Sequence, residues 1–289
     1  MSRPAEFGME GEAGRGGGLE SDRDVRGSAM LLVSVGNTRT RFAAASGESL
    51  MPSRVMVNSD LVGLGDALVD AATGLGENGA SGGFSAVLLA SVNEPVAGVL
   101  AERLSAVNLP PVRRLGRDIP IPIRHLLPAP VTVGQDRLLN ALAAYERTGG
   151  ACAVIDAGTA VTVDLVDAEG EFKGGAIAPG LRAQLAAMSR STAQLPPVEL
   201  PQSCDAWPSD DEAPRAFGVT TSEAMTLGVV CGLRGLVRAL LERYAASVGA
   251  YPRVIATGGD APFLFSNEPV VEHIVPDLTL LGMLACVHA

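Results

Sequence analysis

Two short glycine turns, one in each half of the chain, carry the residue types that bind phosphate. The first reads Gly36-Asn37-Thr38 and the second Gly158-Thr159, and each follows a hydrophobic stretch typical of a strand. Glycine lets backbone N–H groups approach an anion closely because no Cβ intervenes, and threonine hydroxyls add further donors. Two such turns predict two related half-domains that bind one nucleotide between them.

The two turns differ at the position that ends the preceding strand. Asp156 precedes the second turn, whereas the neutral Ser34 occupies the matching position before the first. A strand-end carboxylate with nearby turn carbonyls is a suitable oxygen ligand set for a hard cation. An aspartate before a glycine turn also commonly stabilises the turn itself, so both interpretations of Asp156 stay open here.

A further group of candidate residues begins a predicted helix that runs from residue 134 to about 147. Leu138, Leu142 and Tyr145 fall on one face of this helix. Asp136 lies near its N-terminal end, where the helix dipole favours a carboxylate. Such an aspartate is either a helix cap or a general base that accepts a proton from a hydroxyl.

The rest of the chain alternates between strand-like and helix-like segments, which predicts an α/β fold. We expect a buried strand over 84–92, a helix over 95–107, an extended proline-rich segment over 110–130 and a glycine-proline loop over 173–181 that leads into a helix. We also expect a surface loop over 197–216, a long helix over about 222–244, a strand over 254–256 and a third glycine turn at 257–260.

Composition divides the chain into a tail and two folded parts. Residues 1–28 are glycine-rich and charged with almost no large apolar side chain, so we predict a disordered tail whose removal leaves folding intact. The predicted domains cover 29–148, with the first phosphate turn and the Asp136 segment, and 149–289, with the second and third glycine turns.

Charge and hydropathy exclude several classes of function. The formal net charge of −10 argues against a nucleic-acid partner, which requires clustered basic residues. No uninterrupted apolar run is long enough to span a membrane, and Arg234 and Arg238 interrupt the long helix. The N-terminus does not resemble a signal peptide, so we expect a cytoplasmic protein.

The four cysteines and three helix glycines allow simple structural readings. Cys152, Cys204, Cys231 and Cys286 form no C-x-x-C pair, so we expect no zinc site, and the three in apolar contexts are predicted to be buried thiols. The glycines at 228, 232 and 235 give the long helix a flat face. This face is either a tight internal helix contact or a subunit interface.

Taken in order, these segments resemble the type III pantothenate kinases over nearly everything after residue 29. The matching segments are Gly36-Asn37-Thr38-Arg39, Gly134-Gln135-Asp136-Arg137, Asp156-Ala157-Gly158-Thr159-Ala160, Gly174-Gly175-x-Ile177-x-Pro179-Gly180-Leu181, Thr221, Thr257-Gly258-Gly259 and Pro276 to Gly282.

The resemblance implies a fold of two ribonuclease-H-like domains around a cleft, as in the acetate-kinase, sugar-kinase, Hsp70 and actin superfamily. It implies transfer of the γ-phosphoryl group of ATP to pantothenate, the first step of coenzyme A synthesis. It also implies a homodimer with pantothenate near the subunit interface, a need for Mg²⁺, and activation by K⁺ or another monovalent cation.

The resemblance also assigns roles to individual residues. Asp136 would be the general base, and Asp156 would ligate the monovalent cation. The residues implied to contact pantothenate are Gly134, Gln135, Asp136, Arg137 and Thr221. Those implied to bind ATP are Ser34, Val35, Gly36, Asn37, Thr38, Arg39, Thr40, Arg41 and Thr159, with Thr257, Gly258 and Gly259 near the nucleotide. Asp164 receives no assignment.

The chain departs from the family pattern at two positions. Ser34 stands where the family usually has an aspartate that helps to hold Mg²⁺, and Leu127 stands where it tends to have a tyrosine that contacts pantothenate, with His125 nearby but offset. Ser34 motivates a second hypothesis, a weakened or inactive relative that acts as a ligand-binding or regulatory protein. Leu127 motivates a third, a kinase or phosphohydrolase of the superfamily with another small substrate.

Overall fold

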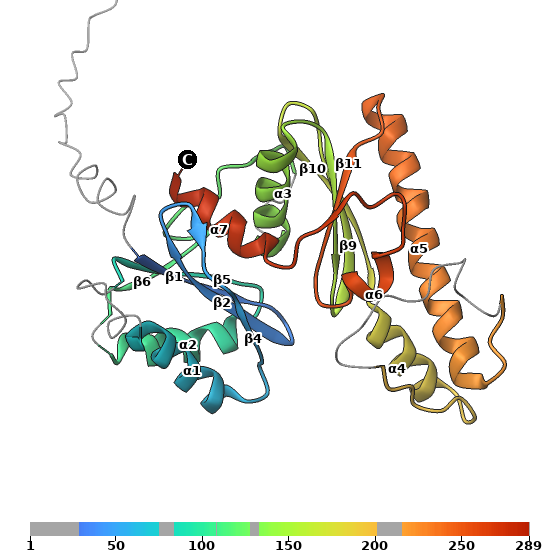
Figure 1. The fold of residues 1–289 in the computed structure, drawn as a ribbon, viewed down its shortest axis with the longest axis horizontal. Coiled ribbons are helices and arrows are strands. Elements are labelled where there is room, and N and C mark those ends of the chain that lie inside the picture. Colours follow the sequence, from blue (N-terminus) through green and yellow to red (C-terminus); the bar gives the residue numbers. More distant parts are fainter. Residues whose placement is uncertain (1–28, 75–83, 108, 128–132, 201–215, 289) are drawn as a thin grey trace, which may run out of the picture.

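The computed structural model describes residues 29–74, 84–107, 109–127, 133–200 and 216–288. The predicted disordered tail, Cys204 and most of the predicted surface loop at 197–216 lie outside the described residues. The described chain is built on two mixed sheets with helices on and between them (Figure 1).

The two sheets have the same strand order. The first sheet runs β3 (Ser49–Leu50), β2 (Arg39–Ser46), β1 (Ala29–Val35), β5 (Ala86–Ser91) and β6 (Val112–Arg114), with β4 (Arg54–Val57) also paired to β2. The second sheet runs β10 (Glu171–Pro179), β9 (Ala160–Val166), β8 (Cys152–Ala157), β11 (Arg253–Thr257) and β12 (His273–Ile274), with β7 (Arg124–His125) added beside β10.

Each sheet begins with an antiparallel hairpin and continues with parallel strands. β1 pairs antiparallel with β2 and parallel with β5, and β8 pairs antiparallel with β9 and parallel with β11. This duplicated order is the ribonuclease-H-like arrangement, so the predicted α/β fold class is confirmed. The tight turn of each hairpin is one of the two glycine turns identified in the sequence.

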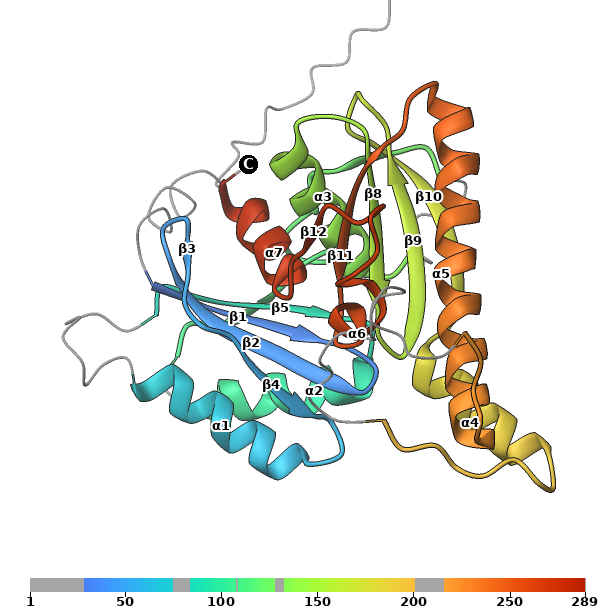
Figure 2. The same cartoon turned by 45° about the vertical axis from the view of Figure 1, so that its right-hand side comes forward.

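The helices form three layers around the two sheets (Figures 1 and 2). Helices α1 (Leu61–Gly74) and α2 (Glu94–Ser105) pack on the outer face of the first sheet through one apolar core. Helices α4 (Leu181–Ser191), α5 (Thr221–Val248) and α6 (Ala261–Phe265) share a second core with the second sheet. Helices α3 (Gln135–Thr148) and α7 (Leu278–His288) lie between the sheets in a third core.

The third core joins the two halves of the chain. It combines Leu32 of β1 with Val154 of β8 and with the facing residues of α3 and α7. Strand β7, which precedes α3 in sequence, pairs with β10 of the second sheet, and α7 at the end of the chain packs back against β1. Both sheets therefore share one apolar layer. The opening between the sheets lies at the turns of their two antiparallel hairpins, β1–β2 and β8–β9.

The segment 173–181 differs from its predicted loop, because residues up to Pro179 belong to strand β10. The glycines there serve close packing rather than a turn: a Cβ on Gly175 would lie 2.1 Å from the carbonyl oxygen of Val163 on the neighbouring strand. Two adjacent glycines resemble a loop signal in sequence, although here they let β9 and β10 approach each other past a bulge.

The long helix α5 corrects two further expectations. Cys231 is exposed, whereas Cys152 and Cys286 are buried as predicted. Among the described residues, a Cβ added at Gly228, Gly232 or Gly235 would meet no atom within 4 Å. No described residue therefore makes the internal contact, and the subunit-interface alternative stays a prediction.

Helix α5 also differs from the expectation that no segment is long and apolar enough to span a membrane. Of the helices in the described ranges, it alone is long and apolar enough to cross a membrane by length and composition. One face of α5 packs into the second core, and Arg234 on this helix pairs with the buried Glu268. A helix at the core of a globular domain has the same properties.

The contact between α3 and α7 gives a direct test of the shared layer. A Cβ on Gly282 would lie 2.1 Å from the carbonyl oxygen of Leu139, so Gly282→Ala forces the two helices apart. We expect a loss of roughly 1–3 kcal/mol in the free energy of unfolding, measured by urea denaturation.

The matched control is Gly98→Ala on α2, where an added Cβ meets nothing within 4 Å. This substitution should leave stability unchanged or raise it by roughly 0.5–1 kcal/mol through helix propensity. Equal urea midpoints for the two variants would contradict this account of the shared layer.

Candidate active site

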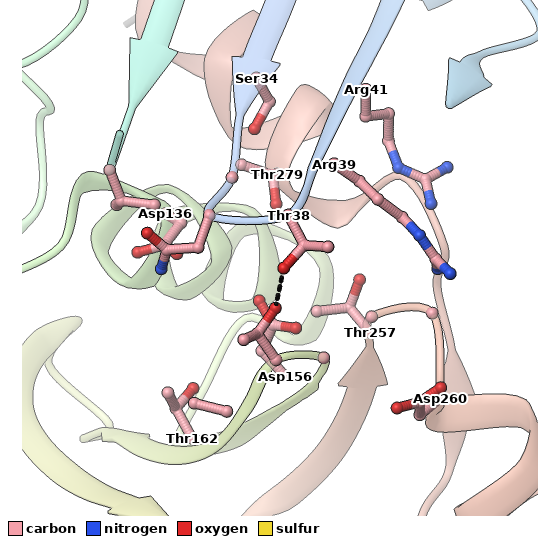
Figure 3. Close-up of a pocket in the computed structure, with 18 of the residues that line it drawn as sticks. Ser34, Thr38, Arg39, Arg41, Asp136, Asp156, Thr162, Thr257, Asp260 and Thr279 are labelled. Carbon is pink, nitrogen blue, oxygen red and sulfur yellow. Dashed lines mark hydrogen bonds between the residues drawn. The ribbon is translucent and has the colours of Figure 1, made fainter. Parts of the chain in front are cut away.

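A cavity of about 730 Å³ opens where the hairpin ends of the two sheets meet. Its lining from the first sheet includes Ser34 to Arg39, Arg41, Ser91 and Val92. Its lining from the central helices and the second sheet includes Asp136, Asp156, Gly158 to Ala160, Thr162, Thr257 to Asp260, Pro276 and Thr279 (Figure 3). The α4 residues Arg182, Ala183, Ala186 and Arg190 complete the wall.

The two glycine turns touch each other across this cavity. The hydroxyls of Thr38 and Thr159 lie 2.8 Å apart and share a hydrogen bond (Figure 3). The first turn is fixed from behind by the buried Asn58, whose Nδ2 donates to the carbonyl of Gly36 at 2.8 Å. The structure therefore brings both predicted phosphate turns to one place and presents their hydroxyls to the same space.

The second turn and the third glycine turn depend on close backbone packing. A Cβ on Gly180 would lie 2.0 Å from the carbonyl oxygen of Gly158. Gly258 has a φ of +94°, and a Cβ there would lie 2.3 Å from the carbonyl oxygen of Ala157. These two glycines let α4 and the end of β11 support the turn of β8 and β9 directly.

Asp136 sits in the first turn of α3 and lines the cavity. The N-cap position belongs to Gly134, so the carboxylate is not the N-cap; its Oδ1 accepts from the N–H of Arg137 at 2.8 Å. A Cβ on Gly134 would lie 2.5 Å from this Oδ1, so glycine leaves room for the carboxylate. Burial raises the pKa of Asp136, which makes it a stronger base than a solvated carboxylate once it is ionised.

Asp156 lies deeper, at the end of β8, and belongs to a chain of polar contacts. Its Oδ2 accepts from Asn140 Nδ2 at 3.1 Å, and Asn140 Oδ1 in turn accepts from the Thr279 hydroxyl at 2.7 Å. Burial, followed by the charge of Asp136, raises the pKa of Asp156 to about 7. Two carboxylates thus share a partly desolvated space, where a cation would offset their repulsion.

The oxygen groups of the cavity fit a hard cation. Among the described residues, no cluster of three or more His, Cys, Asp or Glu side chains could hold a metal ion. Mg²⁺ typically uses only one or two carboxylates together with water and substrate phosphates, so this finding agrees with its usual coordination. Asp136, Asp156 and the neighbouring hydroxyls are the candidate protein ligands on the cavity wall.

Arg137 points away from the turns and is bound by a residue that the sequence reasoning left unassigned. Its Nε lies 3.0 and 3.1 Å from the two carboxylate oxygens of Asp164, and its Nη2 donates to the same carboxylate. The guanidinium also covers the ring of Phe172, 5.7 Å from its centroid. Asp164 alternates in β9 with core residues, and a buried carboxylate on a strand is a signal that a basic partner faces it.

Several residues predicted to bind ligands do not line the cavity of this chain. The Oε1 of Gln135 accepts from the N–H of Ser91 at 3.2 Å, which ties α3 to the end of β5. Thr40 is buried against Asn58, with 2.8 Å between its hydroxyl and Oδ1. Thr221 is exposed in the first turn of α5, and Leu127 packs beside the central core.

The sequence reasoning missed the wall made by α4 and Asp260. Asp260 is 5% exposed and pairs with Arg182, whose Nε lies 3.3 Å from its Oδ1. Arg182, Ala183, Ala186 and Arg190 recur at helical spacing directly after the glycine-proline segment at 173–181. Their spacing on one helix face was the available signal.

Two ribonuclease-H-like sheets around a cavity lined by paired glycine turns are the arrangement of the actin-like ATPase fold. Within this class, the family profile described as type III pantothenate kinase matches residues 30–243. The chain belongs to the type III pantothenate kinase family.

Individual relatives agree with this assignment. A type III pantothenate kinase of Akkermansia muciniphila is 36% identical over 253 residues, which cover 88% of this chain and 96% of the relative. That of Rhodospirillum rubrum is 36% identical over 264 residues, with the same coverage. Among solved structures, a putative Baf family transcriptional activator from Campylobacter jejuni is similar in fold, with a TM-score of 0.55, 19% identity and coverage of 89% and 97%.

The raised pKa of Asp156 predicts that replacing this residue changes the unfolding free energy of the protein. Its folded-state pKa of about 7 lies above the unfolded value near 3.9. The folded protein therefore holds this proton more tightly, and its stability falls as pH rises from about 4 to 7. Asp156→Asn, which keeps an acceptor for Asn140, should raise the unfolding free energy of the ligand-free protein at pH 8 by roughly 1–3 kcal/mol.

This gain should disappear near pH 3, below both pKa values, where the carboxyl of the natural protein is protonated in the folded and the unfolded state. Asp70→Asn on the exposed face of α1 is the matched control and should change little at either pH. Chemical denaturation in a buffer without K⁺ or Mg²⁺ measures both. If Asp156→Asn is no more stable than the natural protein at pH 8, the account of Asp156 as a buried, unbalanced charge is contradicted.

Proposed function

We propose that this protein transfers the γ-phosphoryl group of ATP to pantothenate, the first step of coenzyme A synthesis. The single observation that carries the proposal is the meeting of Thr38 and Thr159, two phosphate-turn hydroxyls, beside the cavity carboxylate Asp136. Membership of the type III pantothenate kinase family supports the same reaction. A cytoplasmic location follows from this metabolic role.

The turns and the carboxylate divide the work of the reaction. Backbone N–H groups and hydroxyls of Gly36 to Thr38 and of Thr159 hold the phosphate chain of ATP. Asp136, when ionised, accepts the proton of the pantothenate hydroxyl as its oxygen attacks the γ-phosphorus. The helix N-terminus around Asp136 also favours negative charge near the reacting groups.

Cations complete the charge balance of the site. Mg²⁺, held through water and phosphate oxygens with Asp136 or Asp156 nearby, would neutralise charge on the transferred group. K⁺ would lie against Asp156, whose pKa is raised by burial and by the nearby charge of Asp136, so that a cation would favour its ionised form. Ser34 supplies a neutral oxygen in this arrangement, which places more of the cation binding on water and ATP.

Arg137 and Thr221 fit pantothenate binding in different ways. The pairing of Arg137 with Asp164 uses Nε and Nη2, so Nη1 takes no part in it. Thr221 does not line the cavity of its own chain, and it begins the helix that carries the exposed glycine face. Nη1 of Arg137 is thus available to the pantothenate carboxylate, and the placement of Thr221 supports a homodimer in which Thr221 reaches pantothenate bound to the partner subunit.

Substituting the proposed base tests the mechanism. Asp136→Asn should lower the turnover of pantothenate by roughly 10²–10⁴-fold because the amide cannot accept the proton. ATP affinity should change little, since the phosphates are held by the turns. ADP release and the mass of the phosphorylated product measure turnover, and calorimetry measures ATP binding.

Asp70→Asn, on the exposed face of α1, serves as the control and should retain activity. A panel of other small alcohols run with the natural protein checks the substrate, because Leu127 alters the expected pantothenate pocket. Full activity in Asp136→Asn would refute the assigned base, and selective phosphorylation of another alcohol would refute pantothenate as the substrate.

The proposed dimer predicts an effect of charge on the glycine face. Gly232→Asp places a carboxylate in the middle of the exposed stripe on α5, where a partner helix would have to bury it. We expect the natural protein to sediment as a dimer and this variant as a monomer with a higher KM for pantothenate.

Gly98→Asp on α2 is the control, because its surroundings are also empty within 4 Å. It should sediment like the natural protein. A natural protein that is monomeric at all concentrations, or a Gly232→Asp variant that stays dimeric, would rule out this interface.

A further inference from the structure

The candidate base and the first phosphate turn belong to different elements, and a short chain of neutral side chains joins them. Asp136 lies in the first turn of α3, Thr38 lies between β1 and β2, and both line the same cavity (Figure 3). Phosphoryl transfer requires the base, the acceptor hydroxyl and the phosphate chain to keep a fixed geometry. Contacts that fix these two elements relative to each other therefore bear on turnover.

Gln135, directly before Asp136, provides the first link of this chain. Helix α3 begins at Gln135, whose Oε1 accepts from the N–H of Ser91, the last residue of β5, at 3.2 Å. Ser91 is buried, and the neighbouring strand β6 has already ended, because its last pair with β5 is Leu89 with Arg114. A buried N–H requires an acceptor, so Gln135 takes the place of the missing strand.

A glycine makes room for the amide of Gln135. Gly116, in the turn after β6, has a φ of +77°, and a Cβ there would lie 2.8 Å from Nε2 of Gln135. The side chain of Gln135 thus packs between the end of β5 and this turn, and Gln135 does not belong to the cavity lining.

Ser91 and Asn93 continue the chain to the first phosphate turn. The Ser91 hydroxyl oxygen accepts from the N–H of Asn93 at 2.9 Å, and Nδ2 of Asn93 donates to the carbonyl of Asn37 at 3.2 Å. Oδ1 of Asn93 also caps α2 by accepting from the N–H of Val96. Because a trans peptide is planar, fixing the Asn37 carbonyl also fixes the direction of the Thr38 N–H, a proposed phosphate donor.

We propose that Gln135 is a positioning residue, and that Gln135, Ser91 and Asn93 form a brace that holds Asp136 in register with the first phosphate turn. This inference rests on the proposed kinase function, and it gives Gln135 a role other than the pantothenate contact that the family resemblance implies. The three side chains of the brace are neutral and do not titrate near pH 7, so the brace keeps its geometry while Asp136 changes its ionisation.

Gln135→Met tests the first link, because methionine keeps the length and helix propensity of glutamine but removes the acceptor. We expect kcat to fall by roughly 10- to 100-fold, since a misplacement of about 1 Å can cost about 10²-fold in rate. KM for pantothenate, and ATP affinity measured by calorimetry, should stay within about twofold, because the brace touches neither ligand.

Gln135→Glu separates positioning from a general structural role. Glutamate keeps an acceptor for the Ser91 N–H, so it should restore most of kcat at the plateau of the pH–rate profile. Its charge beside Asp136 should raise the pKa of that carboxyl and move the acidic limb of the profile to higher pH. Gln135→Met adds no charge, so it should lower the plateau and leave the acidic limb where it is.

Asn93→Ser tests the second link, because serine still caps α2 but lacks the amide donor to Asn37. It should lower kcat by itself and add little in the Gln135→Met background, where the brace is already broken. Gln184→Met on α4 is the matched control. Gln184 is an exposed glutamine outside the cavity lining, with its Nε2 bonded to the Pro179 carbonyl at 2.7 Å, and its replacement should leave kcat unchanged.

Amide hydrogen exchange tests the brace without any turnover. The N–H of Ser91 should exchange several-fold faster in Gln135→Met than in the natural protein, because its acceptor is gone. In Gln184→Met the exchange of Ser91 should match that of the natural protein.

Each outcome decides the proposal. A kcat of Gln135→Met within about twofold of the natural value, or additive effects of the Gln135 and Asn93 substitutions, would overturn it. A higher KM for pantothenate at unchanged kcat would overturn it too, because Gln135 would then contact the substrate. Unchanged exchange at Ser91 would show that the brace is absent. A natural protein that does not phosphorylate pantothenate would refute the proposed function and the catalytic role of the brace together, while exchange at Ser91 would still decide whether the brace exists.

Discussion

The arrangement depends on two carboxylates, Asp136 and Asp156, that face one partly buried space and form no ion pair with another described residue. The basic neighbour in sequence, Arg137, is paired with Asp164, and Asp156 accepts a hydrogen bond from the amide of Asn140. Buried charge without an ion-pair partner destabilises a fold. Under the proposed function, binding of cations and nucleotide would recover the stability that the empty protein gives up.

Close backbone packing makes this arrangement possible. The turns that face the phosphate are supported by glycines, at 180 and 258, where any side chain would collide with the neighbouring turn. The central helices α3 and α7 approach equally closely at Gly282. Glycine therefore serves two purposes in this protein. It leaves backbone N–H groups open to an anion, and it lets the second sheet approach the carboxylates. Because both sheets have the same strand order, both glycine turns lie at the opening of the same cavity.

The sequence predicted the elements whose local signals agree with their tertiary environment. The strand before Gly36, the helix that begins after Gly134 and the hairpin around Gly158 all have the predicted form, because apolar periodicity and turn chemistry point the same way there. The resemblance to type III pantothenate kinases was also confirmed. The roles assigned to individual residues, Asp136 and Thr221 among them, stay predictions.

Features that arise from packing between distant segments could not be predicted. The glycines of β10 resemble a loop in sequence, and only the nearness of Val163 explains them. The partner of Asp164 is visible only once α3 lies over β9, and the pairing of Asp260 with Arg182 is visible only once α4 lies beside the end of β11. Asp260 itself lies in the turn after β11, and α4 supplies only its ion-pair partner Arg182. Exposure of Cys231 likewise depends on which face of α5 meets the second sheet.

The most direct test of the central claim is ADP release by the purified protein with ATP, Mg²⁺, K⁺ and pantothenate, beside a Ser34→Asp variant. The account predicts pantothenate-dependent ADP release by the natural protein, since the paired turns, Asp136 and bound cations suffice for transfer. An inactive natural protein whose activity is restored by aspartate would contradict that claim and identify a ligand-binding relative without turnover. Inactivity of both proteins would contradict the pantothenate kinase assignment itself.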